Sequence, residues 1–107
     1  MEEINCRIWT KDGYQDLIKH EWLNIDNNTL HRLDGPAIEY EDGTKKWMVD
    51  GKLHRLDGPA IEYNNGTKKW WIGGEYLPTE EIEEWLEENK IDLKTQEGQT
   101  AFKLRWI

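Results

Sequence analysis

A tandem repeat constrains this sequence more than any other feature. Residues 30–52 read LHRLDGPAIEYEDGTKKWMVDGK and residues 53–75 read LHRLDGPAIEYNNGTKKWWIGGE, and the two copies agree at 17 of 23 positions. A short period that is kept this closely is typical of stacked arrays, in which each unit leaves an apolar face bare until a neighbour covers it. The repeat therefore predicts two successive, equivalent structural units.

Each unit contains the pattern of a β-hairpin. Ala37 to Tyr40 alternates between apolar and polar residues, residues 41–43 form a turn that contains Gly, and Thr44 to Val49 alternates again. Two alternating runs on either side of a Gly-containing turn favour paired antiparallel strands. Because alternate residues share one face of a strand, we expect equivalent aromatic residues to lie over one another, Tyr40 over Tyr63 and Trp47 over Trp70.

The residues before the two copies carry a weaker version of the same pattern. Ile8 to Gly13 (IWTKDG) matches Ile38 to Gly43 (IEYEDG) at Ile, Asp and Gly. We interpret residues 4–29 as a degenerate first repeat, because the end unit of an array has water on one side and departs from the consensus. The prediction is a mainly β array of about three hairpins, with repeats at residues 30–52 and 53–75.

The pattern changes in residues 76–107, which we assign to a helical cap and a tail. Apolar residues at Ile82, Trp85 and Leu86 follow helical spacing, and Thr79 is a suitable N-cap residue. We predict an amphipathic helix over residues 80–89 that covers the open end of the array. For residues 91–107 we predict a turn or short helix and then a short terminal strand, because Phe102, Leu104 and Trp106 alternate.

Length and charge limit the classes of partner. The chain has 107 residues and fits a single domain, and its formal net charge is −8. Such a charge opposes direct binding to nucleic acid or to an anionic membrane, both of which require Lys and Arg, and it favours a partner with a basic surface. A single Cys6, no long apolar run and no signal-peptide pattern at Met1 to Glu3 predict a cytoplasmic protein.

The repeat resembles the MORN repeat. Starting at Tyr40, the unit has Tyr40, Gly43, Trp47, Gly51-Lys52 and His54 at offsets similar to those of that family, although the usual His-Gly-x-Gly is replaced by HRLDGP. The form HRxDGPAxEYxDGxxxW is similar to variant repeats in small bacterial and tailed-phage proteins. The resemblance implies a ribbon of consecutive hairpins that acts as a scaffold or binding surface without catalysis.

The polar residues of the HRLDGP segments allow two interpretations. As a ligand pocket, His and Asp would hold a metal ion or Arg would hold a phosphate. As structure, Asp would bond to the backbone of its own Gly-Pro turn, and Arg would pair with a carboxylate of the neighbouring unit. The structural interpretation is favoured because these residues are copied with the period, whereas catalytic sites are usually singular. The residues concerned are His31, Arg32, Asp34, His54, Arg55 and Asp57.

Surface aromatic residues and a run of glutamates are the favoured partner-binding candidates. Trp71 replaces Met48 in an otherwise copied unit, and Trp9 and Trp106 also exceed what one aromatic ladder requires. The helix at residues 80–89 carries glutamates that could imitate a phosphate backbone, although a solvated helix face is the favoured interpretation of this run. The glutamates proposed for binding are Glu80, Glu83, Glu84 and Glu87.

These observations favour a binding protein over an enzyme. The sequence shows no nucleophile–base pair, Gly-rich phosphate loop or metal-ligand spacing, so we expect no catalysis and no cofactor. The leading hypothesis is a protein-binding repeat module, encoded by a phage, that inhibits or modulates a host defence or nucleic-acid-handling protein in the host cytoplasm. The alternatives are a nucleotide-binding sponge and a self-assembling structural scaffold.

Overall fold

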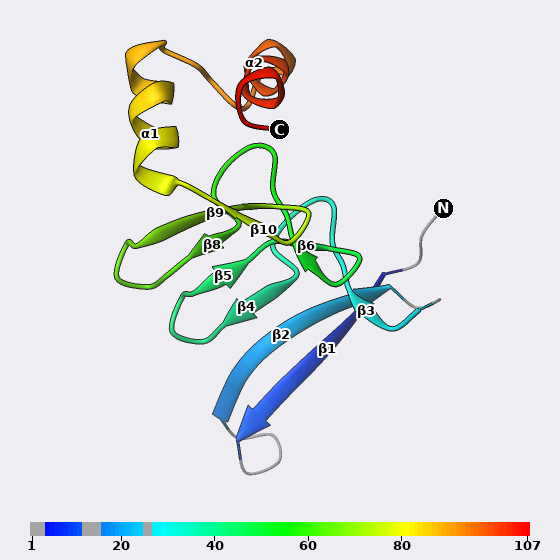
Figure 1. Cartoon of the computed structure of the whole chain (residues 1–107). Coiled ribbons are helices and arrows are strands. Elements are labelled where there is room, and N and C mark those ends of the chain that lie inside the picture. The colour runs from blue at the N-terminus through cyan, green and yellow to red at the C-terminus, as the bar shows by residue number, and fades with distance from the viewer. Residues whose placement is uncertain (1–3, 12–15, 25–26) are drawn as a thin grey trace.

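A computed structural model describes the backbone of residues 4–11, 16–24 and 27–107, and the side chains of residues 19–24 and 27–107. Within these residues the chain forms short strands followed by two helices (Figure 1). The elements are β1 (Ile4–Lys11), β2 (Asp16–Asn24), β3 (Thr29–Leu30), β4 (Ile38–Tyr40), β5 (Lys45–Lys46), β6 (Met48–Val49), β7 (Lys52–Leu53), β8 (Ile61–Glu62), β9 (Lys68–Ile72), β10 (Glu75–Leu77), α1 (Thr79–Glu88) and α2 (Gln96–Trp106).

The strands form an antiparallel sheet that follows chain order. Its sequence of neighbours is β1-β2-β4-β5-β8-β9-β10, β3 pairs with β2, and β6 and β7 form a separate two-stranded ribbon. Both helices lie together beyond the β9–β10 end of the sheet (Figure 1). The predicted antiparallel β-structure with a helix after it is therefore confirmed. The whole chain is elongated, with extents of 48 × 34 × 21 Å.

The two copies of the repeat make matching backbone contacts. Ile38 pairs with Lys46 in the β4–β5 hairpin, and Ile61 pairs with Lys69 in the β8–β9 hairpin. The hairpins are joined because Lys46 also pairs with Ile61. Because each hairpin supplies the edge on which the next one pairs, consecutive hairpins become neighbours in space.

The tryptophan backbones extend this matching to β2. The N–H of Trp22 donates to the carbonyl oxygen of Ala37 at 2.8 Å, and the N–H of Trp47 donates to that of Ala60 at 2.7 Å. Both alanines are fully buried. Trp22 thus has the same backbone contact in residues 4–29 as Trp47 has in the first full copy.

The expected stacking of equivalent aromatic rings is wrong. In the described side chains the rings in contact are His20 with Trp22, Trp70 with Phe102, Trp71 with Tyr76 and Trp85 with Trp106, and none of these pairs is one period apart. Instead, an arginine of the following segment lies over Trp22 and another lies over Trp47. An indole ring attracts a guanidinium to its negative face, and this contact replaces the expected contact between rings.

The hydrophobic core is concentrated at the C-terminal end. Its buried members are Trp70, Ile82, Leu93 and Phe102, and the rings of Trp70 and Phe102 lie 5.6 Å apart. The side-chain oxygen of Thr79 accepts a hydrogen bond from the N–H of Trp70 at 3.2 Å. In the earlier segments the equivalent tryptophan N–H groups donate to the carbonyl oxygens of Ala37 and Ala60.

The prediction that Thr79 is the N-cap of the helix is wrong. Pro78 occupies the N-cap position, and Thr79 is the first residue of α1.

The predicted terminal strand is also wrong, because residues 96–106 form α2. Thr95 is its N-cap, and its hydroxyl accepts a hydrogen bond from the N–H of Gly98 at 3.0 Å. Phe102 is buried and Trp106 packs against the core, whereas Leu104 is 84% exposed. Phe102 and Trp106 are four residues apart and share a helix face, so a helix buries both rings without burying Leu104.

Candidate functional site

The two HRLDGP segments face a common groove. The groove has a volume of about 560 Å³, and Trp47 and Val49 lie between the segments. One residue of α2, Gln99, completes the lining and donates a side-chain hydrogen bond to the carbonyl oxygen of Leu93 at 3.0 Å. Of the six pocket residues predicted from the sequence, five line this single groove: Arg32, Asp34, His54, Arg55 and Asp57.

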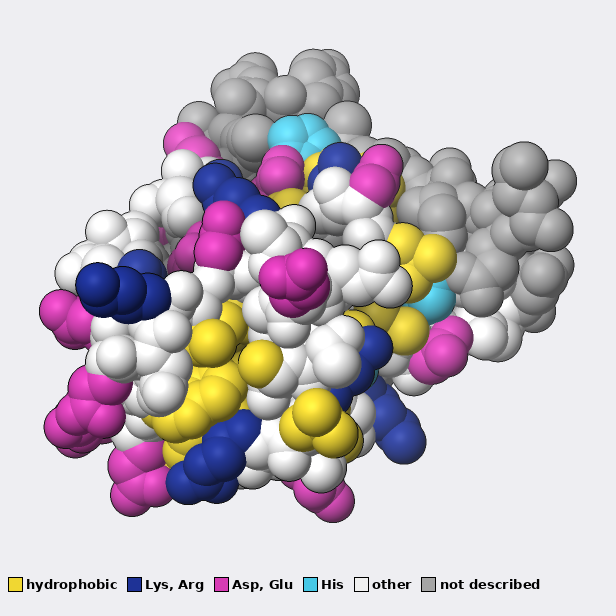
Figure 2. All heavy atoms as spheres, turned by 90° about the horizontal axis from the view of Figure 1, so that it is seen from above, with side chains coloured by type: hydrophobic (Ala, Val, Ile, Leu, Met, Phe, Trp, Pro, Cys, Tyr) yellow, Lys and Arg dark blue, Asp and Glu magenta, His cyan; other side chains and the backbone are white. Residues whose placement is uncertain are grey.

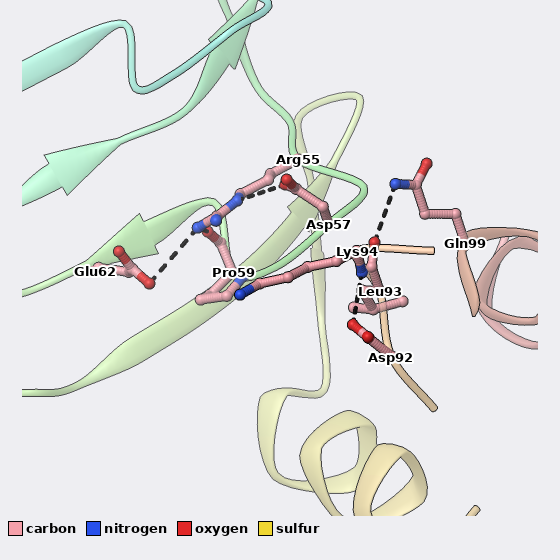
Figure 3. Close-up of polar contacts among 8 residues, drawn as sticks. All are labelled: Arg55, Asp57, Pro59, Glu62, Asp92, Leu93, Lys94 and Gln99. Atoms are coloured by element: carbon pink, nitrogen blue, oxygen red, sulfur yellow. Dashed lines mark hydrogen bonds and ion pairs between the residues drawn. The ribbon is translucent and has the colours of Figure 1, made fainter. Parts of the chain in front are cut away.

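Arg55 contacts three residues that follow it in its own unit (Figure 3), and it also contacts a tryptophan of the preceding unit. Its Nε donates to the carboxylate of Asp57 at 2.7 Å, and its Nη1 donates to the carbonyl oxygen of Pro59 at 3.1 Å. Nη1 also lies 3.5 Å from a carboxylate oxygen of Glu62. The guanidinium carbon is 3.7 Å from the ring centre of Trp47. This set of contacts fixes the turn between the tryptophan and β8.

Arg32 repeats this arrangement one period earlier. Its Nε donates to Asp34 at 3.0 Å, its Nη1 donates to the carbonyl oxygen of Pro36 at 3.2 Å, and Nη1 lies 3.9 Å from Glu39. The guanidinium carbon is 4.1 Å from the ring centre of Trp22. The expectation that Asp bonds to its own turn and Arg to a neighbouring unit's carboxylate is wrong: the ion pairs lie within one unit, and the neighbour contributes the aromatic ring.

The glycine of each segment lies against the other face of the guanidinium. A Cβ atom at Gly58 would lie 2.8 Å from the Arg55 Cζ atom, and one at Gly35 would lie 3.0 Å from the Arg32 Cζ atom. Each arginine is therefore enclosed between an indole ring and a glycine. The motif thus uses Arg, Asp and Gly together to pack a charged group.

The two histidines have matching contacts. Nδ1 of His31 accepts a hydrogen bond from the N–H of Asp50, and Nδ1 of His54 accepts one from the N–H of Gly73, each at 2.9 Å. An imidazole that accepts at Nδ1 carries its proton on Nε2. Burial lowers the pKa of His54, and the positive charge of Lys103 lowers that pKa further. Both side chains thus fasten the turns that follow β6 and β9.

A metal site at these histidines receives no support from the geometry. In the part of the chain that the structure describes, no three His, Cys, Asp or Glu residues lie close enough to hold a metal ion. Cys6 belongs to β1, whose side chains are outside the described set. The aspartates of the motif instead face the arginines of their own segments.

The glutamates of α1 form a continuous solvent-exposed surface. Glu80, Glu81, Glu83, Glu84, Glu87 and Glu88 are all exposed, and none of them forms an ion pair with a described residue. Glu83 accepts a hydrogen bond from the indole N–H of Trp70 at 3.4 Å. Acidic side chains lie along the edge of the molecule where α1 is found, next to hydrophobic side chains (Figure 2).

The tryptophans proposed for partner binding are less accessible than expected. Trp71 is half-buried and packs edge-on against Tyr76, with ring centres 5.3 Å apart. Trp106 packs against the core and edge-on against Trp85. Neither indole N–H has a hydrogen-bond partner among the described residues. Trp9 belongs to β1, and its side chain lies outside the described set.

Sequence reasoning missed the leucines of the motif. Leu33 is 75% exposed and lines the groove together with Leu56. A leucine that is copied between Arg and Asp in an otherwise polar turn is the signal that could have indicated an apolar groove wall.

Lys94 lies near the second HRLDGP segment. Figure 3 shows its side chain extending from the loop before α2 toward Pro59.

Comparison of the chain with protein-family models, with curated proteins and with solved structures finds no match in any of the three. Among the described residues, no helix combines the length and the apolar character needed to cross a membrane.

Proposed function

We propose that this chain is a non-catalytic protein-binding module whose acidic helix α1 docks on a basic surface of its partner. One observation carries the proposal. The six glutamates of α1 are solvent-exposed and without ion pairs to described residues, while Ile82 of the same helix is fully buried. Because Ile82 anchors α1 on the core, the six glutamate charges of this helix are kept at fixed positions on the surface.

The charge density of α1 supports a partner that normally binds nucleic acid. Six charges on ten residues, at a rise of about 1.5 Å per residue, give roughly one charge per 2.5 Å. Duplex DNA carries about one charge per 1.7 Å of its axis. A surface that recognises phosphates through Lys and Arg would meet a comparable density on α1.

The glutamates also oppose helix stability, which supports a role in binding. Glu80 and Glu84, Glu84 and Glu88, and Glu83 and Glu87 are like-charged pairs four residues apart. Each such pair destabilises a helix by about 0.2–0.5 kcal/mol. A helix that only covered the core would not require this cost.

The remainder of the chain serves, in this proposal, as a MORN-like array of hairpins. The matched contacts of residues 22–50 and 47–73 support it, because the same hydrogen bonds recur in both segments. The array provides a rigid base, and residues 76–107 close its C-terminal end. The resemblance of the repeats to those of small phage proteins extends the proposal to a phage-encoded modulator of a host defence or nucleic-acid-handling protein, acting in the host cytoplasm.

Affinity capture with matched charge variants tests the proposal. The test variant is Glu84→Gln, Glu87→Gln, Glu88→Gln, and the control removes three exposed carboxylates elsewhere: Glu41→Gln, Glu75→Gln, Glu97→Gln. Immobilised chain should capture nucleic-acid-binding proteins from a bacterial lysate, and duplex DNA should release them. The α1 variant should lose the captured proteins while the control keeps them. Equal capture by both variants would contradict a role for α1.

A nucleotide-binding role is the second candidate, because two arginines and Trp47 line one groove. The ion pairs of Arg32 and Arg55 with their aspartates weaken this candidate, since a phosphate would have to displace a carboxylate from each. Thermal shift with nucleotides distinguishes the two: a ligand at about 100 times its dissociation constant adds roughly 2.7 kcal/mol of stability.

A further inference from the structure

We propose that the groove between the two HRLDGP segments binds an extended segment of a protein partner that carries two basic side chains three residues apart. The groove lies apart from the α1 glutamates, none of which lines it. The inference rests on the proposed function only in requiring a protein partner, and the two can fail independently.

The polar groups that face solvent in the groove are carboxylates. The side chains of Asp34 and Asp57 are 84% and 50% exposed, whereas those of Arg32 and Arg55 are 23% and 18% exposed. One oxygen of each aspartate accepts from arginine, and the other has no hydrogen bond within the described residues. Because indole and glycine cover the guanidinium faces, an incoming ligand meets the aspartates first.

The local charge favours a cation. Arg32 lies within 4 Å of Asp34 and Glu39, and Arg55 lies equally near Asp57 and Glu62. One positive and two negative charges give each of these three-residue sets a net charge of −1, while Lys103 adds a positive charge near His54. At the exposed aspartates a phosphate would meet carboxylates that repel it, whereas an ammonium or guanidinium would be attracted.

The apolar lining favours a cation on a long aliphatic stem. Leu33 is exposed, and Trp47 and Val49 lie between the two segments. Lys and Arg lay their methylene groups along apolar surface while the charged group stays in a polar environment. A bare metal ion would leave this apolar surface unused, so a basic side chain is the better match.

The repeat sets the spacing between the two basic residues. Asp34 precedes β4 and Asp57 precedes β8, and these strands lie two positions apart in the sheet. Neighbouring strands are about 4.8 Å apart, so equivalent residues of β4 and β8 are separated by roughly 9.6 Å, and we infer a similar spacing for the aspartates that precede these strands. A polyproline II segment rises about 3.1 Å per residue with three residues per turn, which places residues three apart on one side at roughly 9.3 Å. This conformation therefore presents one basic residue to each aspartate.

Two short peptides of equal composition test the inference. One carries Lys-Pro-Pro-Lys, the other Lys-Lys-Pro-Pro, and binding to the full-length chain is followed by amide chemical shifts in NMR spectra. The spaced peptide should move the signals of residues 32–35 and 54–58 and bind more tightly than the adjacent one. Equal affinities, or no binding of the spaced peptide, would overturn the inference.

Variants locate the binding site. Asp34→Asn with Asp57→Asn should weaken binding of the spaced peptide about fivefold or more, since each exposed ion pair contributes modestly. Leu33→Lys leaves the contacts of both arginines intact and should weaken binding, because the new lysine repels the basic side chains of the peptide. This variant provides the test if the double aspartate variant does not fold. Glu84→Gln with Glu88→Gln removes the same charge from α1 and should leave peptide binding unchanged. If instead the α1 variant alone abolishes peptide binding, the groove proposal fails and the proposed function stands.

Discussion

At the scale of single residues, the HRLDGP motif packs a half-buried cation against the tryptophan of the preceding segment. Arg55 is enclosed by Trp47 on one face and Gly58 on the other, and Asp57 accepts from its Nε. The ring belongs to the preceding unit, so this contact couples two units as well as closing a turn. It explains why Trp, Arg, Asp and Gly recur together with the period.

Replacing Gly58 by Ala should therefore destabilise the fold through Arg55. The added Cβ would lie 2.8 Å from the Arg55 Cζ atom, so the guanidinium, at the end of a flexible side chain, must shift on the Trp47 ring. We expect a loss of up to about 1 kcal/mol in the free energy of unfolding, measured by urea denaturation, because the cation–π contact is weakened. The control is a double-mutant cycle with Arg55→Ala. In that background Gly58→Ala should cost much less, and equal costs would show that the clash lies elsewhere.

His54 gives the fold a pH dependence of defined sign. Its Nδ1 accepts the N–H of Gly73, so the folded chain favours the neutral ring, and burial together with Lys103 lowers its pKa. In the unfolded chain the pKa is about 6.5. Above that pH both states are neutral and the stability is fully present. As the pH falls below it, the unfolded state takes up protons first, so stability is lost until the folded pKa is reached.

Thermal melts between pH 8 and pH 5 measure this effect. The midpoint should fall with pH more steeply for the wild-type chain than for His54→Gln, which has no titrating ring. Parallel curves for the two proteins would show that His54 makes no contribution. The carboxylates titrate mostly below this range and act equally in both.

These residue contacts were only partly accessible from sequence. The period favoured a structural interpretation of His31, Arg32 and Asp34 over a ligand pocket, and the same contacts recur at the equivalent residues of the second copy. The partners were not predictable, because the contact between Arg55 and Trp47 joins residues whose approach depends on how one unit sits on the next. Alternation within a strand defines a face but does not determine what covers it.

At the scale of elements, the C-terminal helices supply what a following unit would supply. The N–H of Trp70 donates to the Thr79 hydroxyl, and the Trp70 ring packs against Phe102 of α2. In the earlier segments an alanine carbonyl and an arginine hold those two places. The Thr79 hydroxyl and the Phe102 ring thus take the places of the alanine carbonyl and the arginine at the last tryptophan of the series, Trp70.

The helical state of residues 96–106 was missed because the pattern of three residues fits two structures. Phe102, Leu104 and Trp106 alternate like a strand, but Phe102 and Trp106 also share a helix face. The deciding signals were local. Thr95 caps the helix, and Gly98 allows it to approach the carbonyl of Asp92, where a Cβ would lie 1.9 Å from the oxygen. A strand would require neither the cap hydrogen bond of Thr95 nor the close approach at Gly98.

A pair of alanine variants separates the helix from the strand. Phe102→Ala empties a fully buried site and should lower the free energy of unfolding by about 3–5 kcal/mol. Leu104→Ala removes an exposed side chain and should change it by less than about 0.5 kcal/mol. In a strand both residues would share one face and both variants would be costly. Similar losses for the two would therefore contradict the helix.

At the scale of the whole molecule, stability should be graded along the chain. The radius of gyration is 15.2 Å, against about 13 Å for a compact domain of this length. The clustered core lies at the C-terminal end, where α1 and α2 cover β9. In the proposed array each unit would contact only its neighbours, so the end farther from this core would open without breaking it.

Two matched hydrogen bonds make this gradient measurable by native-state hydrogen exchange. The N–H groups of Trp22 and Trp47 donate to alanine carbonyls at 2.8 and 2.7 Å, so their local bonds are alike. We expect the Trp47 amide to exchange more slowly, by about tenfold for each 1.4 kcal/mol of additional opening free energy. Phe102→Ala, which weakens only the C-terminal core, should narrow the difference by accelerating Trp47 more than Trp22. Equal rates in the wild-type chain would mean that all units open together, and the proposed array would then be a single cooperative domain.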